Sequence, residues 1–189
     1  MAKLYFKYGA MDSSKSANLL QTAYNYTQKG MQVCLAKPII DTKGENKIVS
    51  RIGLERTVDF LIETNENIIN KFNGYDVILI DEAQFLTEQQ INQLYYITKT
   101  YEIPVICYGL RCDFLMNSFE GSRRLLEIAD TIEEIKTICS CGKKATQNLR
   151  IINGKPVFSG AQTMIDNSAE VRYESKCGKC YLKLKEQFS

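Results

Sequence analysis

Residues 4–20 read Leu4-Tyr-Phe-Lys-Tyr8, Gly9-Ala-Met-Asp-Ser-Ser-Lys-Ser16 and Ala17-Asn-Leu-Leu20. An apolar strand ends at Tyr8, the chain turns at Gly9, and a helical pattern begins at Lys15. The spacing of Gly9, Lys15 and Ser16 is that of a phosphate-binding loop, G-x-x-x-x-G-K-[ST]. Such a loop points backbone N–H groups at an anion from a helix N-terminus, so the stretch predicts a nucleotide phosphate site.

The residues of this loop have separate expected roles. Lys15 would place a positive charge on the terminal phosphates, and the hydroxyl of Ser16 would be a ligand for Mg²⁺. Ser14 stands where the motif has its second glycine. If the backbone there needs a positive φ, a side chain costs on the order of 1 kcal/mol. The candidate ATP and phosphate residues are Gly9, Ala10, Met11, Asp12, Ser13, Ser14, Lys15 and Ser16.

A second stretch, Val77-Ile-Leu-Ile-Asp81-Glu82, favours nucleotide binding over the plainer interpretation of a Gly- and Ser-rich turn. Four apolar residues followed by an acid indicate a buried parallel strand. P-loop enzymes hold their metal with a carboxylate at the end of such a strand, which makes Asp81 the candidate for Mg²⁺. Two solvated acids at a strand end remain the competing interpretation.

The rest of the chain alternates between strand and helix patterns, which predicts a parallel sheet covered on both faces. Strands are expected at residues 32–36, 57–61, 103–108 and 131–135, and helices at 65–72, across 91–97 and at 123–129. Thr87 and Gln90 form a capping box for the second of these helices. The polar run 41–51 is typical of a mobile loop. Ligands of such sheets bind beyond the carboxyl ends of the strands.

The composition is that of an ordinary globular protein, with 44% apolar and 24% charged residues in a chain of 189. A net charge of +2 gives no case for broad electrostatic binding to nucleic acid or a membrane. No signal peptide or membrane-spanning apolar run is recognisable, so we expect a soluble, cytoplasmic protein. The absence of histidine leaves acid–base chemistry to carboxylates, Lys, Tyr or Cys.

Two close cysteine pairs, Cys139-Ser-Cys141 and Cys177-Gly-Lys-Cys180, accompany a change of composition after Ile138. Four thiolates form a tetrahedral structural zinc site, whereas reduced thiols or a redox pair are the alternative. We therefore expect a nucleotide-binding domain over 1–137 and a zinc-binding domain over 138–189. Between the pairs, residues 157–175 show little periodicity, as in a loop that is pinned at its base and closes over a substrate.

Taken together, these residues resemble the type II thymidine kinases over essentially the whole chain. The resemblance rests on the phosphate loop, Ile80-Asp-Glu-Ala-Gln-Phe85, Tyr108-Gly-Leu-Arg-x-Asp-Phe114 and the cysteine pairs that flank Tyr173. It implies a P-loop (RecA-like) α/β domain that binds ATP and Mg²⁺, with a small zinc-binding domain carrying a lasso loop. It also implies transfer of the γ-phosphate of ATP to the 5′-hydroxyl of thymidine, and of deoxyuridine, to give dTMP in nucleotide salvage.

The resemblance further implies individual roles. Glu82 resembles the general base that accepts the proton of the 5′-hydroxyl, while Asp81 and Ser16 would serve Mg²⁺. The implied nucleoside pocket contains Met11, Phe85, Leu110, Phe114, Phe119 and Tyr173, and the implied zinc ligands are Cys139, Cys141, Cys177 and Cys180. Asp41 and Arg51 match a looser family pattern near the phosphates. A homotetramer inhibited by dTTP is also implied.

The chain departs from the family pattern at three places. These are Ser14, the short Cys139–Cys141 spacing, and Ile165-Asp-Asn-Ser-Ala169, where relatives often carry Ile-Gly-Gly. Two other functions stay open from the residues. A P-loop ATPase or GTPase would use the acid after Asp81 to orient water. A zinc-ribbon module would bind nucleic acid or a protein partner through its basic residues, which are Lys143, Lys144, Lys176, Lys179, Lys183 and Lys185.

Overall fold

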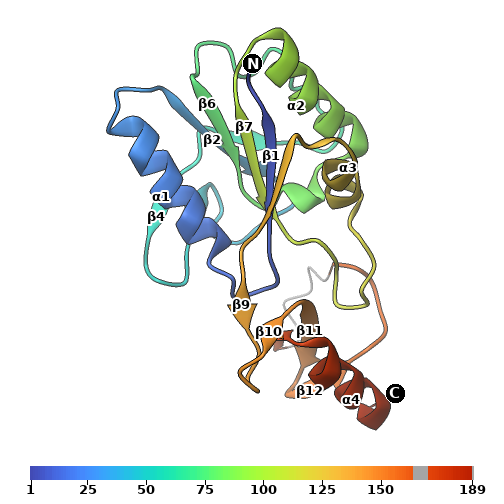
Figure 1. The fold of residues 1–189 in the computed structure, drawn as a ribbon. Helices are drawn as coiled ribbons and strands as arrows, with labels where there is room; N and C mark the ends of the chain where they lie inside the picture. Colours follow the sequence, from blue (N-terminus) through green and yellow to red (C-terminus); the bar gives the residue numbers. More distant parts are fainter. Residues whose placement is uncertain (164–169, 189) are drawn as a thin grey trace.

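The computed structural model describes residues 1–163 and 170–188, and Figure 1 shows a large sheet with a smaller group of elements below it. The strands of the large sheet are β1 (Leu4–Tyr8), β2 (Val33–Pro38), β5 (Phe60–Ile62), β6 (Val77–Ile80), β7 (Val105–Gly109) and β8 (Thr131–Glu134). They lie in the order β5-β2-β6-β7-β1-β8, and every neighbouring pair is parallel. The predicted P-loop α/β class with a central parallel sheet is confirmed.

Helices cover both faces of this sheet (Figure 1). Helix α1 (Lys15–Thr27) lies on one face, and α2 (Glu88–Thr100) and α3 (Glu120–Ile128) lie on the other. All the residues of β6 are apolar because side chains alternate between the two faces of a strand, and helices cover both faces of this sheet. Val77 and Leu79 pack in the cluster that contains Leu19 of α1, whereas Ile78 and Ile80 pack on the side of α2.

The sheet order brings the phosphate loop and the acidic pair to one edge. Strand β7 lies between β1 and β6, so the three strands end side by side. The N–H of Gly9 donates to the carbonyl of Gly109 at 3.2 Å, and the N–H of Asp81 donates to the carbonyl of Ala36 at 3.0 Å. The loop after β1 and the acids after β6 therefore emerge on the side where parallel sheets bind their ligands.

The helix predicted at residues 65–72 is wrong, because the chain there forms successive turns. Asn65 has a φ of 63°, which a continuing right-handed helix does not accommodate. The N–H of Ile68 donates to the side-chain oxygen of Gln93 on α2, at 2.9 Å, instead of to a carbonyl four residues earlier. A tertiary partner thus replaces the local hydrogen bond on which a helix depends.

The mobile loop predicted over 41–51 is also wrong in part, since residues 47–57 form a hairpin of β3 (Lys47–Val49) and β4 (Glu55–Thr57). Ile48 is buried in the cluster beneath α1, so one apolar residue anchors an otherwise polar run. The strand predicted at 57–61 is divided between β4 and β5. The strands at 32–36, 103–108 and 131–135 are confirmed, as is the capping box of Thr87 and Gln90 on α2.

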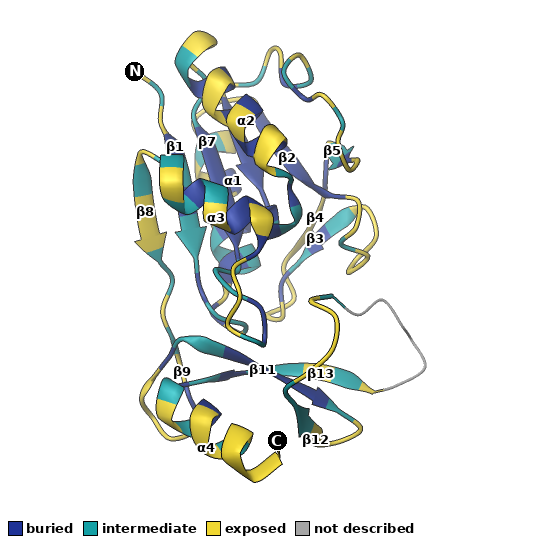
Figure 2. Ribbon diagram, turned by 90° about the vertical axis from the view of Figure 1, so that its right-hand side faces the viewer, coloured by how far each residue is buried: buried dark blue, intermediate teal, exposed yellow. Residues whose placement is uncertain are grey.

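The smaller group, called the small domain below, is built from short antiparallel strands and one helix. Its elements are β9 (Thr137–Ile138), β10 (Lys144–Ala145), β11 (Gln147–Ile152), β12 (Lys155–Val157), β13 (Val171–Lys176) and α4 (Gly178–Phe188). Figure 2 shows β11 and β13 below the carboxyl edge of the large sheet, with α4 on the far side. The prediction of an irregular loop over 157–175 is wrong at its end, which forms β13. The centre of that loop, 164–169, lies outside the described residues.

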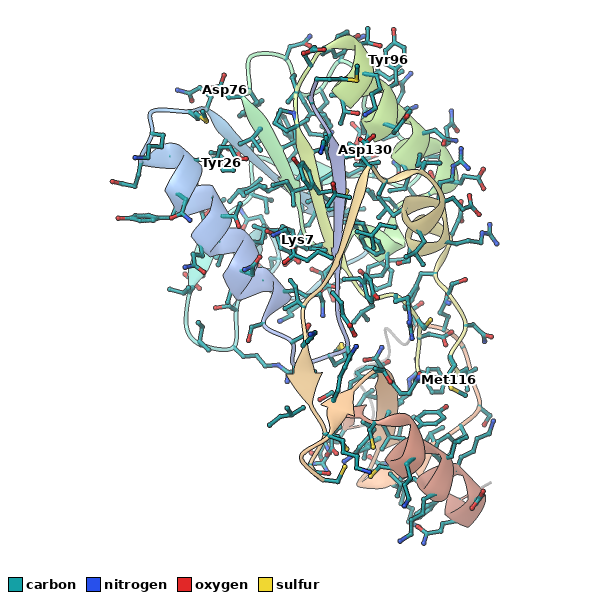
Figure 3. All side chains as sticks on the ribbon, viewed as in Figure 1. Lys7, Tyr26, Asp76, Tyr96, Met116 and Asp130 are labelled. Atoms are coloured by element: carbon teal, nitrogen blue, oxygen red, sulfur yellow. The ribbon has the colours of Figure 1, made fainter. Side chains whose placement is uncertain are left out.

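The loop between β7 and α3 contacts the smaller group of elements. Figure 3 labels Met116 on this loop, next to the small domain. The hydroxyl of Tyr181 on α4 donates to the carbonyl of Phe114 at 2.6 Å. In the part of the chain that the structure describes, no helix is long and apolar enough to cross a membrane.

Candidate active site

The phosphate loop has the left-handed backbone that its missing glycine predicts. Ser14, the residue before α1, has φ 60° and ψ 29°. Gly9 is required for a different reason, because a Cβ there would lie 2.5 Å from the carbonyl oxygen of Ile135. The ammonium group of Lys15 donates to the carbonyl of Ala10 at 2.9 Å and to that of Gly9 at 3.3 Å. The Lys15 ammonium is therefore held by carbonyl groups of the same loop that is predicted to bind the phosphates.

A small cavity of about 130 Å³, which we call the phosphate cavity, lies over this loop. Its lining consists of Met11, Asp12, Ser13, Ser14, Lys15, Ser16, Ala17, Lys43, Ser50, Arg51, Ile52 and Glu82. Arg51 forms an ion pair with Asp12, so the structure brings this candidate to the loop. Gly9 and Ala10 lie outside the lining and present their carbonyls to Lys15. The cavity brings cationic side chains and helix N–H groups together, as an anion site requires.

The second predicted element, Asp81, is 4% exposed at the end of β6. Burial raises the pKa of Asp81, the adjacent Glu82 carboxylate raises it further, and a hydrogen bond from Ser16 opposes the shift. Burial lowers the pKa of Lys15, which Glu82 and Asp81 oppose. Since a buried carboxylate beside a hydroxyl is an oxygen donor set that Mg²⁺ prefers, these residues fit that ion.

Glu82 is held by a residue that sequence reasoning missed. The side-chain amide of Gln84 donates to Glu82, and its oxygen accepts the N–H of Leu110 at 3.0 Å. Gln84 is buried, and a Cβ on Gly109 would lie 2.6 Å from its oxygen. Gln84 therefore fixes the Glu82 carboxylate relative to the loop after β7. Its only signal in the sequence was its place inside the Asp-Glu-Ala-Gln-Phe run.

A second cavity, of about 340 Å³, opens beside Glu82 between the large sheet and the small domain, and we call it the aromatic cavity. All six predicted nucleoside residues line it: Met11, Phe85, Leu110, Phe114, Phe119 and Tyr173. The rings of Phe85 and Phe119 meet edge to face at 5.6 Å. Its volume lies within the roughly 300–1,000 Å³ of small-molecule sites, and its aromatic lining suits a planar base.

Further polar residues line this cavity for which the sequence predicted no individual role. They are Thr42, Lys43, Asp113, Asn148, Gln162 and Thr163. Asn148 on β11 accepts the N–H of Met11 at 2.8 Å and donates to the carbonyl of Cys112 at 2.8 Å. The small domain thus contacts the phosphate loop directly, through a buried amide.

The candidate Asp41 lies in the lining of this second cavity and not in that of the phosphate cavity. The buried ammonium of Lys37 holds it at 3.0 Å and also donates to the carbonyl of Lys43 at 2.6 Å. Lys43 lines both cavities, together with Met11 and Glu82. These three residues mark the place where the two cavities meet.

A third cavity, of about 750 Å³, lies between α1 and the β3–β4 hairpin. Ser13, Ser14, Ala17 and Ile52 line both this cavity and the phosphate cavity. The apolar side chains of Leu20 and Leu54 contribute to its walls. The phosphate cavity therefore adjoins both of the other cavities.

The four candidate zinc ligands converge in the small domain. The sulfur atoms of Cys139, Cys141, Cys177 and Cys180 all lie within 4.8 Å of one another. The sulfurs of Cys141 and Cys177 are 3.6 Å apart. Tetrahedral zinc with Zn–S bonds of about 2.3 Å requires sulfurs about 3.8 Å apart, so the cluster fits that ion despite the short first pair.

Of the basic residues near the cysteines, Lys144 pairs with Glu134, and Lys176 pairs with Glu174 at 2.8 Å. These two carboxylates partly neutralise the cationic surface on which a nucleic-acid module would depend.

Known proteins resemble this chain in sequence over most of its length. Residues 2–181 match the family model described as thymidine kinase. A protein named Thymidine kinase from Rhodopirellula baltica is 45% identical over 186 residues, covering 94% of this chain and 86% of the relative. One of the same name from Legionella pneumophila is 48% identical over 173 residues, covering 87% and 83%. A solved structure of the replication initiator DnaA with AMPPCP and single-stranded DNA aligns with a TM-score of 0.45 and 18% identity, covering 72% of this chain and 41% of that one.

Proposed function

The chain belongs to the thymidine kinase family, and on this premise we propose which of its residues carry out phosphoryl transfer. The protein is an ATP-dependent phosphotransferase whose substrates are thymidine and ATP. The reaction joins the γ-phosphate of ATP to the 5′-hydroxyl and gives dTMP. Such transfer depends mainly on alignment and on neutralising phosphate charge.

Glu82 is the general base in this proposal. The observation that carries it is the shared lining, because Glu82 faces both the phosphate cavity and the aromatic cavity. A carboxylate at that junction lies where a 5′-hydroxyl would meet a γ-phosphate, and it accepts the hydroxyl proton as the new bond to phosphorus forms. Gln84, by donating to Glu82, keeps the carboxylate turned toward the junction.

The phosphate loop, residues 9–16, binds the triphosphate in this proposal. Lys15 leaves its loop carbonyls for the terminal phosphates, while Arg51 and Lys43 add positive charge at the same cavity. The hydroxyl of Ser16 and the carboxylate of Asp81 would hold Mg²⁺, which when bound neutralises phosphate charge. The adenosine end would extend into the third cavity, because that cavity continues from Ser13, Ser14 and Ala17.

Thymidine would occupy the aromatic cavity, with its base among Met11, Phe85, Leu110, Phe114, Phe119 and Tyr173. The phenyl rings supply stacking surface, and Asp113, Asn148 and Gln162 supply polar groups for the base edge. The four cysteines would hold a structural zinc ion, since four thiolates leave no open coordination position. We assign residues 1–137 to the nucleotide-binding domain and 138–189 to the zinc-binding domain.

Three finer parts of the proposal rest on the family resemblance: acceptance of deoxyuridine, inhibition by dTTP and a homotetramer. A cytoplasmic location stays the prediction made from the sequence. Inhibition by dTTP also agrees with the cavities. One dTTP molecule carries both a thymine base and a triphosphate, and the aromatic and phosphate cavities meet at Met11, Lys43 and Glu82.

A nucleoside panel tests the proposed function. Purified protein with ATP and Mg²⁺ is expected to convert thymidine to its 5′-monophosphate, deoxyuridine more slowly, and purine nucleosides at the background rate. Product is measured by mass spectrometry and ADP release by a coupled assay. ADP release that is indifferent to thymidine would identify an ATPase instead, and tight, salt-sensitive oligonucleotide binding without nucleotide product would favour the zinc-ribbon module.

Ser14→Gly is expected to keep or lower the KM for ATP and to stabilise the fold by on the order of 1 kcal/mol, because the αL backbone at Ser14 strains a side chain. Steady-state kinetics at varied ATP and thermal unfolding measure the two effects. Glu102→Gly is the matched control, since Glu102 is exposed beyond α2 with a φ of 57°. It should gain stability at an unchanged KM. A clear rise in the KM of the Ser14 variant would contradict this account of the loop.

A further inference from the structure

Arg150 lies in the middle of β11 with its charged side chain fully buried, at 0% exposure. A buried guanidinium is tolerated only where its N–H groups are all directed at acceptors. Here Nε donates to the hydroxyl of Tyr173 at 2.9 Å. Nη1 donates to the carbonyl of Ala161 and Nη2 to that of Gln162, each at 2.8 Å. The planar fork of the guanidinium therefore donates in three directions, to three separate acceptors.

The position of Arg150 follows from the alternation of β11. Leu149 and Ile151 pack with Tyr181 of α4 in the apolar cluster of the small domain. Asn148, which precedes Leu149, therefore turns to the opposite face, where it accepts the N–H of Met11 in the phosphate loop. Arg150 shares that face, and its guanidinium carbon lies 3.6 Å from the ring centroid of Phe114. A strand of the small domain thus directs its polar side chains toward the aromatic cavity.

The groups that Arg150 holds are the ones that form the cavity wall. Phe114, Gln162 and Tyr173 line the aromatic cavity, whereas Arg150 does not. Gln162 also donates its side-chain amide to Asp113 at 3.0 Å, which joins the Arg150 contacts to a further wall residue. Arg150 contacts Tyr173 as well as the carbonyls of Ala161 and Gln162, so one side chain joins two parts of the cavity wall.

We propose that Arg150 is the positioning residue of the thymidine site, acting through the Tyr173 phenol, the 161–162 backbone and the Phe114 ring. The inference rests on the proposed function and adds a residue to it that touches neither substrate. A planar fork is needed because the three acceptors lie in different directions, and the ammonium of a lysine cannot reproduce it. Loss of the fork loosens the wall against the base while leaving the phosphate cavity intact.

The test is Arg150→Lys, which keeps the charge, with Arg172→Lys as the matched control. Arg172 lies on the neighbouring strand β13 but is exposed, where it pairs with Glu174. In Arg150→Lys we expect the KM for thymidine to rise at least about tenfold, the KM for ATP to change less than about twofold, and kcat to change less than about threefold. The Arg172 variant should match the unaltered protein.

Tyr173→Phe provides a second variant if Arg150→Lys folds poorly, as judged by circular dichroism and thermal unfolding. Removing the phenol hydroxyl takes away one acceptor and should raise the KM for thymidine in the same direction. The double variant should then show less than the product of the two single effects, because both act through one hydrogen bond.

Two results would overturn the inference. One is an unchanged thymidine KM in a folded Arg150→Lys protein. The other is an equal rise in both KM values, which indicates a general structural role. Failure of the unaltered protein and of Arg172→Lys to phosphorylate thymidine would reject the proposed function itself, so the two failures are distinguishable.

Discussion

Glu82→Gln is expected to lower kcat for thymidine phosphorylation by at least about a hundredfold, because an amide cannot accept the proton of the 5′-hydroxyl. The affinity for ATP should stay nearly unchanged, since Lys15, Ser16 and Asp81 keep their positions. The substituted side chain still presents an oxygen to the amide of Gln84, so the local hydrogen bond is retained. Steady-state kinetics at saturating thymidine and an ATP titration by calorimetry measure the two quantities.

Glu127→Gln is the matched control for that experiment. Glu127 is exposed on α3, where it pairs with Arg124 at 2.9 Å, and it lines neither cavity. Its variant should keep the parent kcat. A decrease of only a few fold in the Glu82 variant would remove this residue as the base and leave alignment and charge neutralisation as the source of catalysis.

Cys177→Ser is expected to have the largest effect on stability. Zinc content should fall from about one ion per chain to a small fraction of that, because a closed four-thiolate site loses a ligand. Thiolate–zinc bonding contributes about 10 kcal/mol or more in small metal-dependent domains. Since Leu149, Ile151 and Tyr181 form a separate apolar cluster here, we expect a net loss nearer 3–5 kcal/mol. The midpoint of unfolding should fall by roughly 10 °C.

The loss of zinc should also raise the KM for thymidine, because Cys177 follows directly after β13, which carries Tyr173. Cys112→Ser is the control, since Cys112 is a partly exposed thiol outside the cysteine cluster. It should retain zinc and the parent unfolding temperature. A Cys177 variant that is as stable as the parent, or a parent that purifies without zinc, would show that the cluster consists of ordinary thiols.

The parts of the fold that the sequence predicted correctly depend on local signals. Strand β6 is four apolar residues long and is buried on both faces, so its pattern needed no knowledge of its neighbours. The capping box of α2 is formed by residues three apart. The positive φ of Ser14 follows from the motif in which it replaces glycine.

The parts that were wrong or missed depend on partners distant in sequence. The helix expected at 65–72 does not form because Gln93 of α2 takes the N–H of Ile68. Asn148 reaches Met11 across 137 positions. Arg150, placed within an apolar run, finds its acceptors 11, 12 and 23 residues further along. Neither periodicity nor motif spacing encodes such pairings. A charged residue inside an apolar run, however, indicates that the residue must find a partner elsewhere in the chain.

A crystal structure with thymidine and a non-hydrolysable ATP analogue tests the junction of the two cavities most directly. The account predicts the base among the aromatic side chains and a carboxylate oxygen of Glu82 within about 3.2 Å of the 5′-oxygen, with that oxygen facing the γ-phosphate. A 5′-hydroxyl turned away from Glu82, or a nucleoside bound outside the aromatic cavity, would contradict it.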